Sequence, residues 1–145
     1  MVLITKRFEE LSTTELYEIL KLRVAVFVVE QNCPYPELDD LDQTALHVWL
    51  QDEGGIQAYL RIMPKNEERE YVSIGRVIAV NRRQGHATRL VTEAIRLAQE
   101  RFSADKIYLE AQVYAKELYA RLGFREISDV FLEDGIPHIQ MLLDI

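Results

Sequence analysis

A short basic turn with one glycine is the part of this sequence best suited to chemistry. It lies in residues 78–87, where an apolar run ends in Arg82 and Arg83 and a helical pattern begins at Gly85. The first turn of a helix offers free backbone N–H groups and the positive end of the helix dipole, and glycine lets a ligand approach the backbone. Two arginines add donors that fit phosphate oxygens. The turn therefore predicts a ligand that carries phosphate groups.

The same turn differs from two common nucleotide-binding loops. It lacks the Lys-Ser/Thr ending of a nucleoside triphosphate loop and the three glycines of a dinucleotide loop, which disfavours both classes of ligand. A plain strand-to-helix connection is the alternative interpretation, because short glycine motifs often recur by chance. The turn alone does not decide between a phosphate site and a plain connection.

The composition favours a cytoplasmic protein with a single domain, residues 1–145. Of the 145 residues, 48% are hydrophobic and 28% charged, and the chain is long enough to bury a sizeable core. One cysteine, Cys33, excludes an intramolecular disulfide, and no apolar run resembles a membrane span or a secretory signal. The net charge of −7 argues against nucleic-acid binding and is compatible with a cationic substrate. We expect neither a nucleic acid nor a membrane as a partner.

The hydrophobic pattern predicts a mixed sheet with helices packed on it. A capping box at Ser12 and Glu15 begins one helix, a second follows Gly85, and a third ends at Gly123. Strands are expected at residues 2–8, 45–50, 56–63, 71–80, 107–112, 124–132 and 137–143. This order of elements belongs to the α/β (α+β) fold class.

A second motif lies downstream of the turn, around Tyr119, Gly123 and Phe124. Arg-x-x-Gly-x-Ala from Arg82, an amphipathic helix, a strand and Tyr-x-x-x-Gly-Phe together resemble the GNAT superfamily of acetyl-CoA-dependent N-acyltransferases. The resemblance implies a GNAT-like mixed, mostly antiparallel central sheet flanked by helices. It also implies that N–H groups of the turn bind the CoA pyrophosphate and that the strand end at residues 78–80 pairs with the pantetheine arm.

The N-terminal half narrows the resemblance to the ElaA-like subgroup of GNAT proteins. The residues that carry it are Leu22-Arg23-x3-Phe27-x2-Glu30-Gln31-x-Cys33-Pro34-Tyr35, Glu37-x-Asp39-x2-Asp42, Ala111-Gln112-x-Tyr114 and Glu133-Asp134-Gly135-Ile136-Pro137-His138. The resemblance then covers almost the whole chain. Gln112 departs from the wider superfamily, in which asparagine is common at this position, but it retains an amide that can contact CoA.

The resemblance implies an enzyme that transfers acetyl from acetyl-CoA, its cosubstrate, to a primary amine in a ternary complex, with no metal. A non-catalytic CoA-binding module of the same fold is the alternative, and the CoA-type turn argues against acyl-homoserine-lactone synthesis. The acceptor is not readable from the sequence, and exposed strand edges permit a homodimer. The implied CoA-binding residues are Ile78, Ala79, Val80, Arg82, Arg83, Gln84, Gly85, His86, Ala87, Thr88, Gln112 and Tyr119.

The resemblance also gives Tyr119 a catalytic role. It stands at the family's acid position, where a phenol can protonate the leaving thiolate. The alternative interpretation is an aromatic side chain packed under the sheet. A backbone N–H near Val80 is expected to stabilise the tetrahedral oxyanion, and His86 is expected to be a solvent-facing helix residue.

Glu110 and His138 are the candidates for the base that deprotonates the amine. Glu110 could instead face solvent, and a histidine on a strand, such as His138 or His47, is more often a packing residue. His47 with Asp39 and Asp42 could suggest a metal site, but the spacing is unspecific and no metal is expected.

An acidic run at residues 37–42 also has two interpretations. It is either a solvated loop or a rim that attracts a cationic amine to the acceptor site. Arg23 and Glu30 could form an ion pair that holds the first helix, or they could line the acceptor pocket. The sequence does not separate these alternatives.

Overall fold

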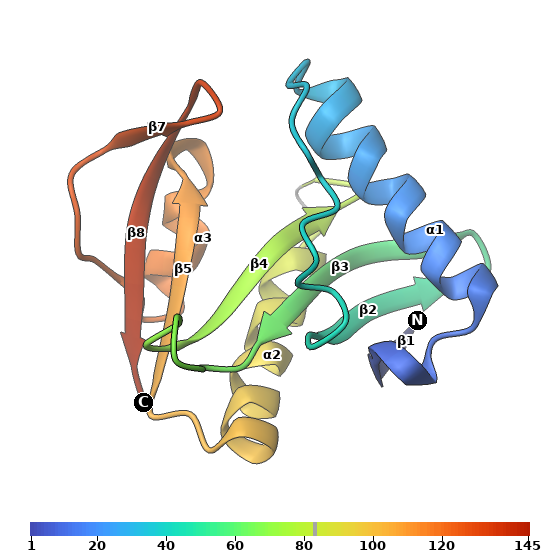
Figure 1. Ribbon diagram of the computed structural model, residues 1–145, viewed down its shortest axis with the longest axis horizontal. Helices are drawn as coiled ribbons and strands as arrows, with labels where there is room; N and C mark the ends of the chain where they lie inside the picture. The colour runs from blue at the N-terminus through green and yellow to red at the C-terminus, as the bar shows by residue number, and fades with distance from the viewer. Residues whose placement is uncertain (83) are drawn as a thin grey trace.

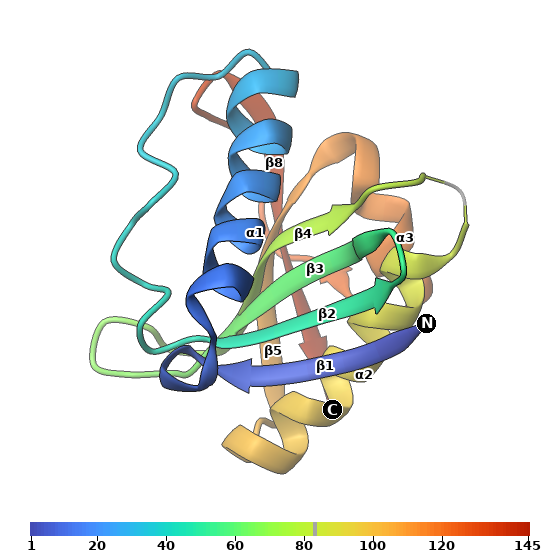
Figure 2. The ribbon, with the colours of Figure 1, turned by 90° about the vertical axis from the view of Figure 1, so that its right-hand side faces the viewer.

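The computed structural model describes residues 1–82 and 84–145, so Arg83 lies outside the described residues. Figure 1 shows one twisted sheet with α1 (Thr13–Val24) in front of it and α2 (His86–Phe102) behind it. Figure 2, turned by 90°, shows the two helices on opposite faces of the strands. The predicted fold, a mixed and mostly antiparallel sheet flanked by helices, is confirmed.

Within the described residues, eight strands form the sheet in the order β1-β2-β3-β4-β5-β8-β6, with β7 paired to β8. Neighbouring strands are antiparallel except for β4 and β5, which are parallel because α2 connects them. The strands are β1 (Val2–Arg7), β2 (Leu46–Asp52), β3 (Gly55–Met63), β4 (Val72–Ala79), β5 (Lys106–Gln112), β6 (Arg125–Glu126), β7 (Phe131–Glu133) and β8 (Ile136–Asp144).

The predicted capping box opens α1. The Ser12 hydroxyl accepts from the Glu15 N–H at 3.0 Å, and the Ser12 N–H donates to the Glu15 carboxylate at 2.8 Å. A π-helical segment, η2 (Ala25–Glu30), extends α1 toward a long loop, residues 31–45. Such π-helical turns are frequent at functional sites, and this one leads into the loop that covers one face of the sheet.

Glycines in the left-handed region flank both later helices. Gly85, with a φ of 75°, precedes α2, and Gly123, with a φ of 101°, follows α3 (Lys116–Arg121). The short 3₁₀ turns η1 (Phe8–Glu10) and η3 (Val113–Ala115) link β1 to α1 and β5 to α3. None of the described helices combines the length and the apolar surface that a bilayer-crossing helix needs.

Two hydrophobic cores lie on the two faces of the sheet. The larger one joins α2 and α3 to the strands and includes Leu60, Ile74 and Leu90. The smaller one holds α1 against the sheet and includes Ile19 and Tyr59. Neighbouring strand residues point to opposite faces, so Leu60 and Tyr59 serve different cores. The sheet is therefore covered by packed side chains on both sides of β3.

The strands β4 and β5 pair at one end and diverge at the other (Figure 1). Their parallel ladder contains two residue pairs, Val72–Ile107 and Ser73–Tyr108. Further along β4 the register with β3 shifts, and Arg76, with a φ of 53°, is the extra residue of a bulge. A bulge bends the strand that carries it. The bulge lies three residues beyond the last β4–β5 pair, in the part of β4 that diverges from β5.

The prediction of one strand over residues 124–132 is wrong. The segment holds two short strands, β6 and β7, which pair with different parts of β8. Between them the Ser128 hydroxyl accepts from the Gln140 N–H at 2.9 Å, so a side chain takes the place of a backbone partner. The other predicted strands and the three predicted helices are confirmed.

Candidate active site

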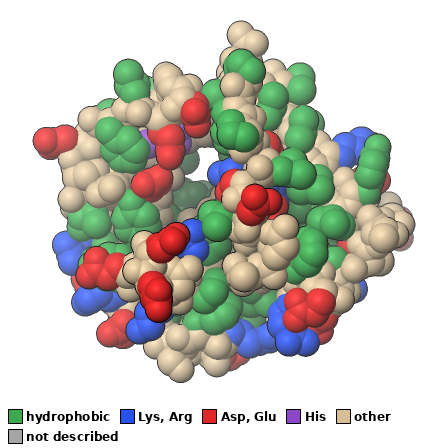
Figure 3. Space-filling view, in the orientation of Figure 1, with side chains coloured by type: hydrophobic (Ala, Val, Ile, Leu, Met, Phe, Trp, Pro, Cys, Tyr) green, Lys and Arg blue, Asp and Glu red, His purple; other side chains and the backbone are tan. Residues whose placement is uncertain are grey.

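A cleft of about 520 Å³ opens where β4 and β5 diverge. Its floor is the sheet face opposite α2, and its walls include the loop 31–45 and the hairpin of β7 and β8. Alternate residues of a strand point to opposite faces, and the apolar ones point to the α2 core. The intervening polar residues therefore lie on the floor of the cleft, among them Arg61, Ser73, Tyr108, Glu110 and Gln112. Figure 3 shows the surface hollowed here, between the half with β5 and β8 and the half with α1.

The cleft gathers four of the residues that the sequence singled out. Tyr119 of α3, Glu110 and Gln112 of β5, and His138 of β8 all line it. The β5–β8 register explains part of this arrangement, because Gln112 and His138 are directly paired. The candidate acid and both candidate bases therefore share one cavity.

Tyr119 is both a packed residue and a lining residue of the cleft. It is 7% exposed, and its ring meets that of Phe124 edge to face, with the ring centroids 6.0 Å apart. Burial raises the pKa of the Tyr119 phenol well above its usual range. The phenol consequently stays protonated at neutral pH, which is the state that an acid requires. The packing and acid interpretations are compatible.

His138 lines the cleft, and its contacts indicate which ring nitrogen carries the hydrogen. Its Nδ1 lies 2.7 Å from the carbonyl oxygen of Ile136. Because a carbonyl oxygen only accepts, Nδ1 carries the hydrogen and Nε2 of the neutral ring keeps its lone pair. Nε2 lies 3.7 Å from the Glu133 carboxylate, and the ring stacks on Phe131 with centroids 6.0 Å apart. These contacts fix both the tautomer and the orientation of the ring.

Glu110 is an exposed lining residue rather than a buried one. It accepts a hydrogen bond from the Tyr108 hydroxyl at 2.8 Å. Glu133 lines the same cleft from β7, and burial together with the charge of Glu110 raises the pKa of Glu133 above its usual range. Two carboxylates this close to each other favour binding of a proton or a cation.

The basic turn stands at the N-terminus of α2, as predicted. Gly85 caps the helix without a side-chain bond, so no side-chain cap uses the first N–H groups, those of His86, Ala87 and Thr88. A Cβ on Gly85 would meet no heavy atom within 4 Å, so the approach to this backbone is open. Gln84 is exposed, whereas His86 is half-buried and not simply solvent-facing as expected.

Arg82 is the described arginine of the turn, since Arg83 lies outside the described residues. Arg82 donates to Glu30 at 2.8 Å, and both side chains are more than half exposed. Exposed ion pairs contribute little stability. Arg82 can therefore leave Glu30 for another anion at small cost.

At the end of β4, the backbone N–H groups point alternately toward β3 and toward the diverging β5. The Val80 N–H donates to the Gln57 carbonyl at 2.9 Å, so the expected oxyanion donor is already in use. Successive strand residues direct their N–H groups to opposite sides. The N–H of Ile78 therefore points toward β3, like that of Val80, and the N–H of Ala79 points toward β5. The Ala79 N–H takes the place of Val80 as the candidate donor.

Two polar contacts join the halves of the molecule across the cleft. The side-chain amides of Gln31 and Gln112 donate to each other, each at 3.2 Å. The Cys33 thiol lies 3.4 Å from the carbonyl oxygen of Asp134 in the β7–β8 hairpin. Gln112, for which a CoA contact is predicted, thus also bonds to the loop 31–45.

Comparison with known proteins agrees with this geometry. A family model described as an acetyltransferase (GNAT) domain matches residues 14–145. The chain belongs to the GNAT family. Protein ElaA of Escherichia coli strain K12 is 39% identical over 142 residues, which cover 94% of this chain and 92% of ElaA. The predicted resemblance to the ElaA-like subgroup is confirmed.

Solved structures match the chain over almost its full length. The crystal structure of Escherichia coli ElaA gives a TM-score of 0.92 at 35% identity and covers 99% of both chains. An acyl-CoA N-acyltransferase from Pseudomonas aeruginosa gives a TM-score of 0.90 at 36% identity with the same coverage. The GNAT family and fold place this chain in the acyltransferase class.

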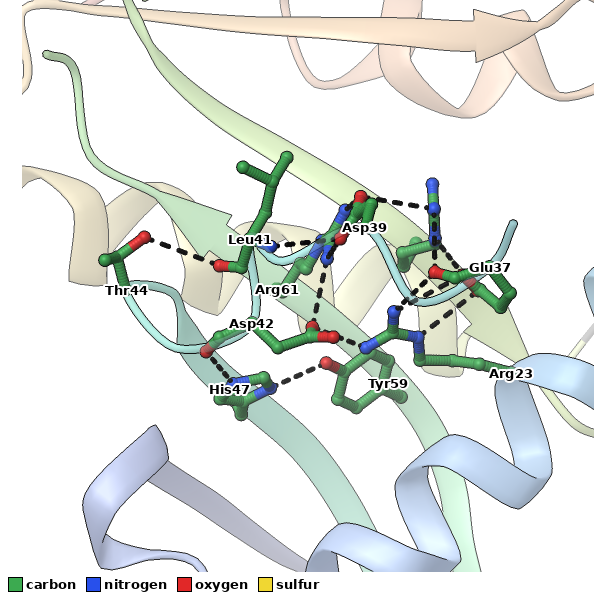
Figure 4. A network of polar contacts seen from close by, with 10 residues as sticks. Arg23, Glu37, Asp39, Leu41, Asp42, Thr44, His47, Tyr59 and Arg61 are labelled. Carbon is green, nitrogen blue, oxygen red and sulfur yellow. Dashed lines mark hydrogen bonds and ion pairs between the residues drawn. The ribbon is translucent and has the colours of Figure 1, made fainter. Parts of the chain in front are cut away.

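A buried ion network holds the loop 31–45 of this GNAT protein in place (Figure 4). Arg23 of α1 donates to Asp42 at 2.6 Å and to Glu37 at 3.3 Å. Arg61 of β3 donates to Asp39 at 2.9 Å and to Asp42 at 3.0 Å. Arg23, Glu37, Arg61 and Asp42 are all buried. For these carboxylates the solvated-loop interpretation of the acidic run is wrong, because the folded sheet presents arginines to them.

Arg76, the bulge residue, joins this network from the cleft side. It donates to Glu37 at 2.7 Å and to Asp39 at 3.4 Å, and its guanidinium lies 5.5 Å from the centre of the Tyr35 ring. Both Arg76 and Asp39 line the cleft, so one member of the acidic run does reach the candidate site. Asp40, by contrast, is exposed to solvent.

The ion pair suggested between Arg23 and Glu30 is wrong. Arg23 bonds to Glu37 and Asp42, while Glu30 bonds to Arg82 at the other end of η2. Residues seven positions apart lie two turns away along a helix, but the loop 31–45 folds back and offers Arg23 nearer carboxylates.

Arg61 and Arg76 were not singled out by the sequence, although a signal for both exists. Each is a lone arginine inside an otherwise apolar strand segment of this GNAT chain. A buried arginine needs a carboxylate partner, and the acidic run 37–42 offers several. The combination of the two patterns predicts a buried ion network, but not its pairing.

His47 is a structural residue, in line with the packing interpretation. Its Nδ1 lies 2.7 Å from the Tyr59 hydroxyl and its Nε2 lies 2.9 Å from the Asp42 carbonyl oxygen. Burial lowers the pKa of the His47 imidazole, which favours the neutral ring. Across residues 1–82 and 84–145, no group of three or more His, Cys, Asp or Glu is arranged to hold a metal ion.

Proposed function

We propose that this GNAT protein, one domain over residues 1–145, transfers an acetyl group from acetyl-CoA to a primary amine by direct attack in a ternary complex. The observation that carries the proposal is the divergence of β4 and β5, which leaves a cleft lined by Tyr119, His138 and Glu110. The similar structure from Pseudomonas aeruginosa is that of an acyl-CoA N-acyltransferase, which supports the same donor class.

The donor is expected to bind along the end of β4 and the start of α2. The uncapped N–H groups of His86, Ala87 and Thr88 suit the CoA pyrophosphate, with Arg82 turning from Glu30 toward a phosphate. The backbone groups of Ala79 suit an amide of the pantetheine arm. The thioester then reaches the cleft between the two strands.

The reaction begins when the neutral amine attacks the thioester carbonyl carbon. A C–N bond forms and the carbonyl electron pair moves to oxygen, where the Ala79 N–H stabilises the negative charge. The intermediate then collapses, the C–S bond breaks, and the Tyr119 phenol gives its proton to the thiolate sulfur. The products are the acetylated amine and the free thiol of CoA.

His138 is the proposed base that removes the amine proton, through Nε2. Because Nδ1 donates to the Ile136 carbonyl, Nε2 is the unprotonated nitrogen of the neutral ring. Glu110 is the second candidate, because its carboxylate lines the same cleft and attracts a cationic amine before attack. A pH–rate profile of H138N and of E110Q separates the two, since only the true base shifts the acidic limb of kcat/KM.

Release of CoA thiol from acetyl-CoA tests the proposal across a panel of primary amines. We expect amine-dependent thiol release that depends on Tyr119. Tight CoA binding without release for any amine would instead favour a non-catalytic CoA-binding module. Absence of CoA binding would overturn both functions.

A further inference from the structure

Two buried polar atoms on the cleft floor have no hydrogen-bond partner among the described residues. They are the Ser73 hydroxyl and Nε of Arg61. Ser73 is 5% exposed and Arg61 is 2% exposed, and both line the cleft. The β3–β4 register pairs Ser73 with Met63 and Arg61 with Gly75, so the two side chains are diagonal neighbours on one face. Buried donors without partners are rare in folded proteins and need an explanation.

Arg69 adds a third donor at this end of the cleft. It lies in the loop between β3 and β4, where backbone hydrogen bonds with Asn66, at 2.9 and 3.2 Å, form a tight turn. Arg69 is half-buried and lines the cleft. The buried ion network has as many arginines as carboxylates, and Arg69 is not a member of it. Glu67, Glu68 and Glu70 of the same loop are exposed and do not line the cleft, so Arg69 is the charge that this loop presents to the cavity.

The opposite wall carries the opposite charge. Glu110, Glu133 and Asp134 line the cleft from β5 and from the β7–β8 hairpin. In the part of the chain that the structure describes, none of the three forms an ion pair with a lysine or arginine. Figure 3 shows acidic and histidine side chains on this side of the hollow, whereas basic and acidic side chains lie next to each other along the facing edge. The cleft lining thus has three carboxylates on one wall, and on the other wall a balanced ion network together with Arg69.

We propose that the acceptor is an amino carboxylate. Its primary amine lies against Glu110 and Glu133, and its carboxylate accepts from Ser73, from Nε of Arg61 and from Arg69. The inference rests on the proposed function and names the acceptor class for it. A carboxylate satisfies hydroxyl and guanidinium donors together, whereas a plain polyamine has only donors to offer and leaves all three unpaired.

The length of the acceptor follows from the strand geometry. Ser73 pairs with Tyr108 where the strands join, and Glu110 is two residues further along β5. Two residues of a strand span on the order of 7 Å. An unbranched amino acid whose amine lies several carbons from its carboxylate matches this spacing better than glycine does.

Matched acceptors test the carboxylate without changing the protein. The series is δ-aminovalerate, its amide and pentylamine, with thiol release from acetyl-CoA as the readout. We expect kcat/KM for δ-aminovalerate to exceed that for the amide and for pentylamine by about tenfold or more, the typical effect of charge-assisted hydrogen bonds. Equal values for the three compounds, with amine-dependent turnover, would overturn the inference and leave the proposed function intact.

Variants locate the effect at the proposed donors. We expect S73A and R69Q each to reduce the preference for δ-aminovalerate over its amide several-fold. K65Q, which removes an exposed charge from the same loop outside the cleft, is the matched control and keeps the preference. A preference that S73A and R69Q leave unchanged would contradict the assignment.

A binding measurement keeps the inference testable without turnover. Valerate, which lacks an amine, is titrated into the wild-type protein and S73A in the presence of CoA and followed by NMR. We expect shifts at residues around Ser73 in the wild type, weaker binding of valeramide, and weaker binding of valerate to S73A. If no amine is acetylated but valerate binds in this way, the proposed function fails and the carboxylate site stands. If valerate does not bind, the site fails.

Discussion

Tyr119 shows how one side chain serves the core and the cleft together. Its ring packs edge to face against Phe124 beneath the sheet, while the residue also lines the cavity between β4 and β5. Burial that stabilises the ring also raises the pKa of the phenol and keeps the proton in place. The apolar packing of α3 thereby sets the protonation state of the proposed acid.

Replacement of Tyr119 by phenylalanine isolates the hydroxyl. We expect Y119F to lower kcat about 100-fold or more, because general acids contribute at least this factor, while the dissociation constant for acetyl-CoA stays unchanged. Stopped-flow thiol release and calorimetric CoA binding measure the two quantities. Y71F is the control. Tyr71 stacks on Tyr108 but does not itself line the cleft, so this variant removes a tyrosine hydroxyl outside the cleft. Wild-type turnover in Y119F would refute the acid assignment.

Gly85 gives a second prediction for a single residue. Its φ of 75° is unfavourable for any other residue, so G85A should destabilise the fold by about 1–2 kcal/mol and disturb the N–H groups of the first turn of α2. We expect the KM for acetyl-CoA to rise about tenfold. G55A is the control, because Gly55 also has a positive φ and open space but lies in the β2–β3 hairpin. A similar rise in KM for G55A would exclude a local effect.

Single residues were predictable where a motif supplied the chemistry. Tyr119 and His138 line the cleft and Gly85 precedes α2, while their roles stay predictions. The hydrogen-bond partners of Arg23 and of Gln112 were not predictable, because they are distant in the sequence and only the tertiary fold brings them together. Motifs indicate which groups matter, and tertiary contacts decide what those groups touch.

At the scale of elements, the loop 31–45 is an irregular segment that a buried ion network holds in place. It has no helix or strand of its own, yet its carboxylates meet arginines from α1, β3 and β4. Such a network requires all its members, because an unpaired buried charge is costly. The loop is therefore a fixed wall of the cleft as long as the network is complete.

Asp42 is the central member of this network, since it receives both Arg23 and Arg61. We expect D42N to lower the free energy of unfolding by about 3 kcal/mol, because one carboxylate charge between two buried guanidinium groups is lost. Urea denaturation measures the change. D40N makes the same chemical change at an exposed position of the same loop and should change stability by less than about 0.5 kcal/mol.

Elements were predictable where hydrophobic periodicity was long. The strands of the N-terminal half follow from apolar alternation, α1 from its capping box, and α2 from helical spacing of apolar residues. The split of residues 124–132 into β6 and β7 was not predictable, because it depends on Ser128 bonding to Gln140 of another strand. The bulge at Arg76 was also missed, since only pairing with β3 reveals an extra residue.

For the whole molecule, the ion network predicts how stability depends on pH. Burial alone would raise the pKa of Asp39, but hydrogen bonds and the charge of Arg61 outweigh it and hold the value at about 2. Burial likewise opposes ionisation of Asp42, but the hydrogen bond and charge of Arg23, followed by those of Arg61, lower its pKa. The folded state thus binds protons less readily than the unfolded chain, in which aspartate has a pKa of about 3.9. This stability is present above about pH 4 and is lost as the pH falls toward 2.

Thermal unfolding between pH 6 and pH 2 tests this dependence, with a steep fall expected at the acidic end of the range. In D39N the fall should be shallower, because the variant has one titrating group fewer, whereas D40N should follow the wild type. An identical acid profile for D39N and the wild type would mean that other carboxylates govern acid unfolding.

The bulge at Arg76 bears on how insertions and deletions change this sheet during evolution. The residues on either side of it, Gly75 and Val77, already face opposite sides of the sheet, so loss of the Arg76 codon alone would leave every other side chain of β4 on its present face. The strand would then be regular and free to continue its pairing with β5. A single codon therefore decides whether β4 carries a bulge where it borders the cleft.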